Sequence, residues 1–129
     1  MTRTIETDIL VIGAGSGGLS VAAGASQLGV DATLLEGGEM GGDCLNTGCV
    51  PSKAFLRAAK AAHEVRHTGR FGVNGHEPAI DFPAVKAHVR KVVDGIAPMD
   101  SVERFEGLGV RVIREYGRFV DDHTVVAGD

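Results

Sequence analysis

The first 36 residues alternate apolar, glycine-rich and helix-compatible segments. Residues 8–12 form a short, mostly apolar run, which is typical of a buried strand in a parallel sheet. A glycine-rich turn at 13–18 follows, and residues 19–28 favour a helix that stops at a glycine. A second short strand is predicted at 31–35. This order predicts one βαβ unit.

Two longer helices are predicted in the middle of the chain. The first covers 52–67, where Ala, Lys, Arg and Glu are frequent and Pro51 suits the first helical turn. A loop over 70–80 separates it from a second helix, which begins after Asp81 as a capping residue. The second helix has a continuous apolar face. This face carries Val85, Val89, Val92, Val93 and Ile96.

The last third of the chain predicts short elements. Pro98 interrupts the second helix, and Asp100 with Glu103 resembles a capping box at the start of another helical piece. The whole pattern predicts an α/β fold: a Rossmann-like half-domain with a parallel sheet, covering helices and a small β-meander at its C-terminal end. Short strands are predicted at 110–114, 118–120 and 123–127, with a turn at 121–122.

Composition and charge narrow the range of functions. The chain has 129 residues, of which 43% are hydrophobic and 23% charged, as suits one domain with its own core. A net charge of −4 without a run of Lys or Arg argues against nucleic-acid binding. The apolar stretches fall far short of the ~20 residues that span a bilayer, and the N-terminus lacks the apolar segment of a secretory signal. We therefore expect a cytoplasmic protein with no nucleic-acid or membrane partner.

The glycine-rich turn fits the pattern G-x-G-x-x-G and lies between a predicted strand and a predicted helix, as in dinucleotide-binding folds. In such folds Gly13 makes the tight turn, Gly15 lets the backbone approach a pyrophosphate, and Gly18 lets helix and strand pack closely. Glu36 ends the second predicted strand, where a carboxylate can accept hydrogen bonds from ribose hydroxyls. The alternative interpretation is an ordinary glycine-rich turn with a surface glutamate.

The segment GGDCLNTGCVPSK contains the two cysteines of the chain, Cys44 and Cys49. In a regular helix their Cα atoms would lie ~8.7 Å apart, whereas a disulfide needs roughly 4.4–6.8 Å. Gly48 and Pro51 can supply the irregularity that brings the two sulfur atoms together. A close cysteine pair near a helix start is typical of a redox-active pair.

Two alternatives compete with a redox disulfide. Cys44 and Cys49 together with His63 and His67 nearly match the spacing of a two-Cys, two-His zinc site. A helix start directly after Cys49 disagrees with the β-hairpin that such a site needs, so we expect no metal site. The second alternative is a free or merely structural pair of cysteines.

The glycine-rich turn, Glu36 and the cysteine segment together resemble the class I pyridine nucleotide-disulfide oxidoreductases, the flavoenzymes related to dihydrolipoyl dehydrogenase, glutathione reductase and mercuric reductase. The resemblance implies that the bound dinucleotide is FAD. It implies that Cys44 is the interchange thiol that attacks the substrate and that Cys49 lies against the flavin. It also implies that Lys53 lies near flavin N5 and that Gly117 contacts the adenine end. The implied cofactor-binding residues are Gly13, Gly15, Ser16, Gly17, Gly18, Glu36, Gly42, Cys44, Lys53 and Gly117.

The resemblance further implies a reaction. Electrons would pass from NAD(P)H through the flavin to a Cys44–Cys49 disulfide, and then to a disulfide or soft metal-ion substrate, in a full-length homodimer. Members of the family are several times longer than this chain. We therefore expect residues 1–129 to be the N-terminal part of an FAD-binding domain, without the NAD(P)H and interface domains and inactive alone. The alternative is a standalone FAD- or nucleotide-binding module without turnover.

Overall fold

The computed structural model describes residues 3–128 and has a three-stranded parallel sheet at its centre. Its strand order is β1 (Ile9–Ile12), β2 (Ala32–Leu35) and β3 (Arg111–Ile113). Ile9 pairs with Ala32 in the first ladder, and Leu35 pairs with Ile113 in the second. All four residues of β2 are buried, Thr33 included, as expected for a strand with a neighbour on each side.

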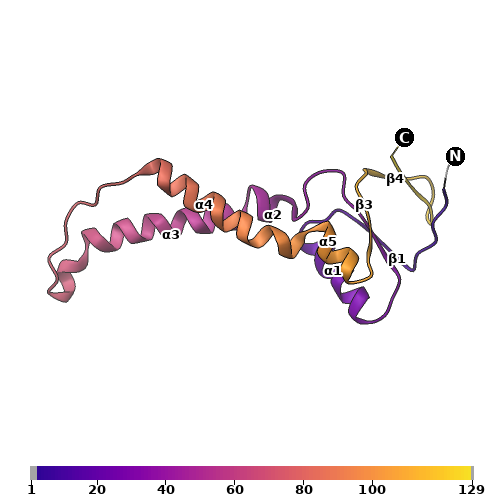
Figure 1. The fold of residues 1–129 in the computed structure, drawn as a ribbon, viewed down its shortest axis with the longest axis horizontal. Coiled ribbons are helices and arrows are strands. Elements are labelled where there is room, and N and C mark those ends of the chain that lie inside the picture. Colours follow the sequence, from indigo (N-terminus) through magenta and orange to yellow (C-terminus); the bar gives the residue numbers. More distant parts are fainter. Residues whose placement is uncertain (1–2, 129) are drawn as a thin grey trace.

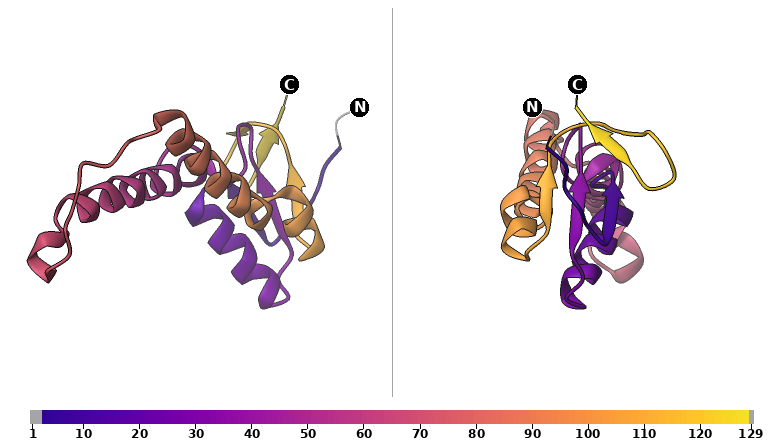
Figure 2. Two further views of the ribbon diagram at one scale, coloured as in Figure 1. Left: turned by 60° about the vertical axis from the view of Figure 1, so that its left-hand side comes forward. Right: turned by 90° about the vertical axis from the view of Figure 1, so that its right-hand side faces the viewer.

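Two helices cover one face of this sheet (Figures 1 and 2). Helix α1 (Ser16–Gln27) connects β1 to β2, and helix α5 (Val102–Gly107) precedes β3. Together with the inward-facing residues of the strands they enclose the core. The core consists of Val11, Ala14, Leu19, Ala22, Ala25, Ala32, Leu34, Phe105 and Val110.

A two-stranded antiparallel hairpin lies against the opposite face of β2. It is formed by β4 (Gly117–Phe119) and β5 (Val125–Ala127), so the expected β-meander consists of two strands here. The strand expected at 110–114 is β3, the third strand of the parallel sheet. Gly117 packs closely on the sheet, since a Cβ atom there would lie 2.7 Å from Leu35 Cδ1.

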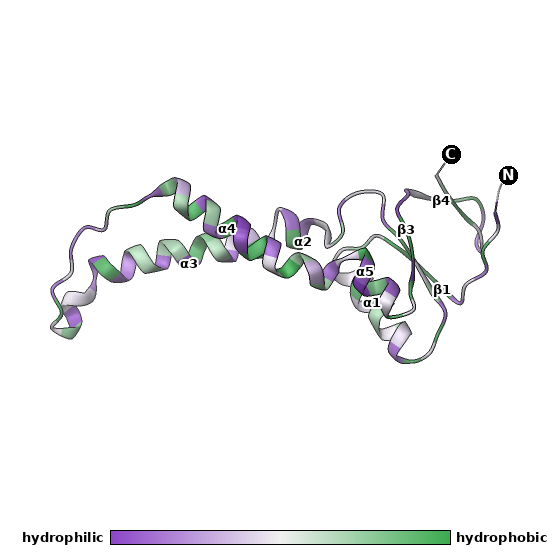
Figure 3. Ribbon diagram, in the orientation of Figure 1, coloured by the Kyte–Doolittle hydropathy of each residue, from purple (hydrophilic) through white to green (hydrophobic). Residues whose placement is uncertain are grey.

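Helices α3 (Cys49–Arg66) and α4 (Phe82–Ile96) lie side by side and project away from the sheet (Figure 1). Hydrophobic and hydrophilic residues alternate along α4 (Figure 3). The valines of this helix are partly buried, and α4 packs against α3. The predicted cap at Asp81 is confirmed, since its Oδ1 accepts a hydrogen bond of 3.0 Å from Ala84 N. A 3₁₀ turn, Thr68–Phe71, and an irregular segment connect the two helices.

The sequence pattern missed several helix boundaries. A short helix, α2 (Gly42–Asn46), occupies the cysteine segment, and α3 begins at Cys49 and not at residue 52. Another 3₁₀ turn, Ala97–Asp100, follows α4. The cap of α5 is Ser101 and not Asp100, because Ser101 Oγ accepts a hydrogen bond of 3.2 Å from Arg104 N. Over residues 3–128, none of the helices combines the length and apolar character that crossing a membrane requires.

Phe105 is the largest side chain in the core and is only 1% exposed. We predict that Phe105→Ala lowers the free energy of unfolding by about 3–5 kcal/mol, because it removes buried area and leaves a cavity between α5 and the sheet. Phe119→Ala is the matched control, since Phe119 is 67% exposed in the hairpin. Urea denaturation followed by circular dichroism measures both variants, and equal losses would contradict this description of the core.

Candidate active site

The glycine-rich turn connects the end of β1 to the start of α1. Gly13 adopts a left-handed conformation with φ of 100°, which favours glycine, and its N–H donates a hydrogen bond of 2.7 Å to Leu35 O. Helix α1 is capped by Gly15, and no side chain accepts a hydrogen bond from its first turn. The first N–H groups of a helix have no partner within the helix. They are therefore directed at the space in front of α1, together with the positive end of its dipole.

The glycine turn packs tightly where α1 meets β1 and is accessible on its other side. A Cβ atom at Gly18 would overlap the carbonyl oxygen of Gly13, so only glycine permits this packing of α1 on β1. A Cβ atom at Gly13, Gly15 or Gly17 would meet no protein atom within 4 Å. The backbone of the turn is thus accessible to a ligand, and its shape and its free N–H groups fit a pyrophosphate.

Glu36 lies at the edge of this turn. Its Oε2 accepts a hydrogen bond of 2.7 Å from Ala14 N, and its Oε1 accepts one of 2.6 Å from Gly38 N. Arg114 supports the same segment by donating to the carbonyl oxygens of Glu36 and Gly38. The ring of Tyr116 lies directly against Gly37 and leaves no room for a Cβ atom there. These contacts fix the carboxylate beside the glycine turn.

The cysteine segment packs directly on the glycine turn. Gly41 N donates a hydrogen bond of 2.9 Å to Ala14 O. Gly42 has a φ of 58°, and a Cβ atom there would lie 2.8 Å from the Cα of Gly15. The two backbones therefore meet closely, and a side chain at position 42 would separate them. This contact places Cys44, half a turn further along α2, close to the space in front of α1.

The two cysteines lie on either side of a helix break. Cys44 belongs to α2 and Cys49 begins α3, so the expected departure from a regular helix is confirmed. The break depends on Gly48, because a Cβ atom there would lie 2.9 Å from Asp43 O. Both cysteines are free thiols in this structure. The expected disulfide between them stays a prediction.

The environment of Cys44 raises the pKa of its thiol. The largest cause is the hydrogen bond with the Cys49 thiol, followed by partial burial, and the negative charge of Asp100 contributes further. At a given pH, a smaller fraction of Cys44 is therefore thiolate than for an ordinary cysteine.

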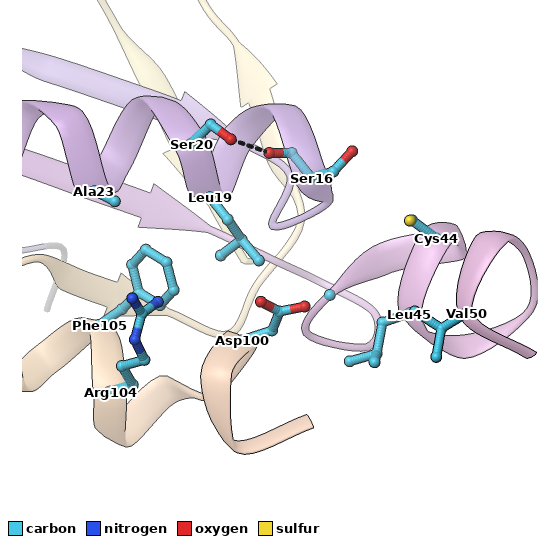
Figure 4. Close-up of a pocket in the computed structure, with 11 residues that line it drawn as sticks. Ser16, Leu19, Ser20, Ala23, Cys44, Leu45, Val50, Asp100, Arg104 and Phe105 are labelled. Carbon is cyan, nitrogen blue, oxygen red and sulfur yellow. Dashed lines mark hydrogen bonds between the residues drawn. The ribbon is translucent and has the colours of Figure 1, made fainter. Parts of the chain in front are cut away.

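Cys44 opens into a cavity of about 310 Å³ between α1, α2 and the start of α5, whereas Cys49 does not line it (Figure 4). Leucine, valine and phenylalanine side chains form most of its wall, and two serines, Asp100 and Arg104 add polar groups. The residues that line it are Ser16, Leu19, Ser20, Ala23, Gly41, Cys44, Leu45, Val50, Asp100, Arg104 and Phe105.

The remaining predicted site residues lie further from this cavity. Lys53 is exposed on α3, one helical turn after Cys49, so the two residues share a face of the helix. Gly117 lies at the start of β4, next to Tyr116 and thus near the segment that holds Glu36. The structure therefore brings the glycine turn, Glu36, Gly42 and Cys44 together.

The four residues of the zinc alternative do not form one cluster. His63 stacks on His67 with ring centroids 4.0 Å apart, further along α3 than the cysteines. Across residues 3–128, no three Cys, His, Asp or Glu side chains gather in a way that could hold a metal ion.

Sequence reasoning missed Asp100 and Arg104 as residues of the site. From the sequence, Asp100 is predicted only to cap a helix and Arg104 has no predicted role, and nothing in the local pattern indicates that they line a cavity with Cys44. It also missed Arg114 and Tyr116, whose contacts with the segment around Gly37 cross almost 80 positions of the chain. The only sequence feature that could have indicated this contact is the position of Tyr116 directly before Gly117.

A parallel sheet with an accessible glycine turn, a carboxylate after the second strand and a cysteine pair packed on the turn defines a dinucleotide-binding protein with a candidate redox site. The profile of the family described as "Pyridine nucleotide-disulphide oxidoreductase" matches residues 7–129. The chain belongs to this family.

Curated relatives carry the same segment. A dihydrolipoyl dehydrogenase of Haemophilus influenzae is 37% identical over 134 residues, which cover 100% of this chain and 27% of the relative. Dihydrolipoyl dehydrogenase 2 of Haloarcula marismortui is 40% identical over 123 residues, which cover 95% of this chain and 25% of the relative. The chain thus spans about a quarter of the length of the curated relatives it matches.

A solved structure confirms the fold. The Cu(II) complex of the HOCl-induced flavoprotein disulfide reductase RclA from Escherichia coli superposes with a TM-score of 0.73 and 20% sequence identity. The superposition covers 93% of this chain and 24% of that protein. The Rossmann-like α/β fold predicted from the sequence is therefore confirmed.

We predict that Cys49→Ala speeds the alkylation of Cys44 in the reduced protein at pH 8. Removing the Cys49 thiol removes the largest cause of the raised pKa, so the pKa of Cys44 falls and its thiolate fraction at pH 8 rises severalfold. Mass spectrometry of the iodoacetamide adduct between pH 7 and 10 measures the change. Ser20→Ala, on the wall of the same cavity, should keep the wild-type pH profile. A Cys49→Ala profile that matches the wild type would contradict this origin of the pKa shift.

Proposed function

We propose that this chain is the N-terminal part of an FAD-binding domain in an FAD-dependent oxidoreductase. In the full-length homodimer, electrons pass from NAD(P)H through the flavin to a Cys44–Cys49 disulfide and then to a disulfide or soft metal-ion substrate. The contact of Gly42 with Gly15 carries this proposal, because it joins the cysteine segment to the dinucleotide turn. Two independent motifs thus serve one site.

The residues around the turn suit the binding of FAD. The N–H groups at the start of α1, in Ser16, Gly17 and Gly18, would hold the pyrophosphate. Each Glu36 oxygen accepts one backbone hydrogen bond and keeps a second lone pair for a ribose hydroxyl. Gly117 would contact the adenine end. When bound, FAD supplies a two-electron carrier between the nicotinamide and the cysteine pair.

The positions of the two cysteines support separate roles. Cys44 lines the cavity through which a substrate can approach, so its thiolate would attack one sulfur atom of a substrate disulfide. The substrate S–S bond breaks, one substrate thiolate leaves and takes up a proton, and a mixed disulfide with Cys44 forms. Cys49 then attacks the Cys44 sulfur and releases the second substrate thiol. The cysteine pair is oxidised to its disulfide and the substrate is reduced by two electrons.

Lys53 and Cys49 would face the flavin from the start of α3. Their spacing of one helical turn places an ammonium group beside the thiol that does not line the cavity. A positive charge at this position stabilises a thiolate and a negatively charged reduced ring. The relatives named dihydrolipoyl dehydrogenase and disulfide reductase support a disulfide as the substrate class.

We predict that Gly15→Val in the full-length protein gives a colourless, folded apoprotein. The position has an ordinary φ of −78°, and a Cβ atom there would meet no protein atom within 4 Å, so the fold should accept the side chain. The valine would occupy the space that a pyrophosphate needs. FAD content by absorbance at fixed protein concentration measures the effect, and Gly24→Ala in the same helix should stay yellow. A Gly15→Val protein with full flavin content would refute the assignment.

We predict that Cys44→Ser and Cys49→Ser each lower NAD(P)H-dependent disulfide reduction by the full-length protein at least about a hundredfold, because each removes one of the two sulfur atoms that exchange. In the oxidised wild type, both thiols should become available for labelling only after mild reduction. His63→Ala is the control and should keep full turnover. Two thiols that label without reductant, or turnover that survives Cys44→Ser, would show that the pair has another role.

A further inference from the structure

A single carboxylate faces the cavity beside Cys44. Asp100 ends the 3₁₀ turn after α4, and its side chain extends between Leu19 and Leu45 toward the space that Cys44 borders (Figure 4). Its Oδ2 lies 3.1 Å from the position that a Cβ atom of Gly41 would occupy, at the base of α2. The carboxylate therefore lies next to the segment that carries the exchanging thiol.

Asp100 has no cationic partner among the described residues. The ion pairs over residues 3–128 are Lys60–Glu64 and Arg66–Glu77, both on or near the projecting helices. Arg104 also lines the cavity, but its Nη1 donates a hydrogen bond of 2.7 Å to Met99 O and its guanidinium lies 5.3 Å from the ring centroid of Phe105. Its charge is thus held away from Cys44, whereas the charge of Asp100 is free to act on a ligand.

We propose that Asp100 determines charge specificity at Cys44, so that the site favours disulfides with a protonated amine near the sulfur atoms over disulfides with a carboxylate there. This inference rests on the proposed function. A half-buried carboxylate attracts an ammonium group and repels a carboxylate more strongly than a fully exposed one, because its partly apolar surroundings have a lower effective dielectric constant than water. Ser16 and Ser20 add hydroxyl groups that can hydrogen-bond an ammonium group, and Leu19 and Leu45 flank the carboxylate (Figure 4).

Three symmetric disulfides of similar size test the proposal in the full-length holoenzyme: cystamine (cationic), bis(2-hydroxyethyl) disulfide (neutral) and 3,3′-dithiodipropionate (anionic). In Asp100→Asn, the ratio of kcat/KM for cystamine to that for dithiodipropionate should fall about tenfold, the size expected for one charge contact near a protein surface. The test compares this ratio between the variant and the wild type. The ratio in one protein under one condition is not informative, because cystamine also has a better leaving thiol. A lower Cys44 pKa in the variant affects all three substrates alike and cancels.

Glu103→Gln is the matched control, since it removes one negative charge from the same segment but does not line the cavity. Its ratio should equal that of the wild type. If Asp100→Asn does not fold, the wild type still tests the proposal. Its ratio should fall as ionic strength rises from about 50 mM to about 500 mM, because salt screens the carboxylate.

An unchanged ratio in Asp100→Asn, or a wild-type ratio that does not respond to salt, overturns the specificity proposal. If Cys44→Ser abolishes reduction of the neutral disulfide in the same assay, the proposed function stands and only the role of Asp100 is wrong. If Cys44→Ser still reduces the neutral disulfide, the proposed function itself fails. The two failures are therefore distinguishable with one set of substrates.

Discussion

The contact between the backbones of Gly15 and Gly42 is the constraint on which the rest of the site depends. It requires glycine at position 42, because a Cβ atom there would lie 2.8 Å from the Cα of Gly15 and push the two segments apart. It also requires β1 and β2 to be parallel neighbours, since only then do the glycine turn and the segment after Glu36 leave the sheet at the same edge. The hydrogen bond from Gly41 N to Ala14 O fixes the separation of the segments.

Once this contact forms, the glycine at position 48 gives the two cysteines different surroundings. The break between α2 and α3 turns the chain, so Cys44 stays at the cavity while Cys49 begins a long helix with Lys53 one turn away. A continuous helix would hold the two residues too far apart for exchange. The difference between a thiol that lines the cavity and one that does not therefore follows from one local irregularity.

Residues that lie late in the chain support the segment that holds Glu36, at the edge of the glycine turn. Arg114 and Tyr116 follow β3, which pairs with β2, so they arrive beside the segment that holds Glu36. The arginine donates hydrogen bonds to two carbonyl oxygens of this segment, and the tyrosine ring covers Gly37. The position of the Glu36 carboxylate thus depends on a third strand as well as on its own.

The sequence by itself determined the local units of this protein. The order of short strand, glycine turn, helix and short strand predicted β1, α1 and β2, and Asp81 correctly predicted where α4 begins. The glycine spacing and the cysteine segment indicated the family, because each depends on backbone conformations that a few neighbouring residues decide. Local patterns did not identify the correct capping residue where two neighbouring residues both suit a helix cap. Ser101 rather than Asp100 caps α5, because both residue types suit a cap and the preceding 3₁₀ turn decides which one is free.

Only the tertiary structure decided which segments meet. The short helix α2 forms because Gly41 and Gly42 pack on the turn, and the placement of Asp100 beside Cys44 depends on how the chain returns from the projecting helices to β3. These contacts join residues that are tens of positions apart. The pattern of hydrophobic and polar residues does not indicate which distant residue each of them contacts. Chain periodicity specifies which face of an element is buried, whereas the direction in which each element returns to the sheet determines what that face meets.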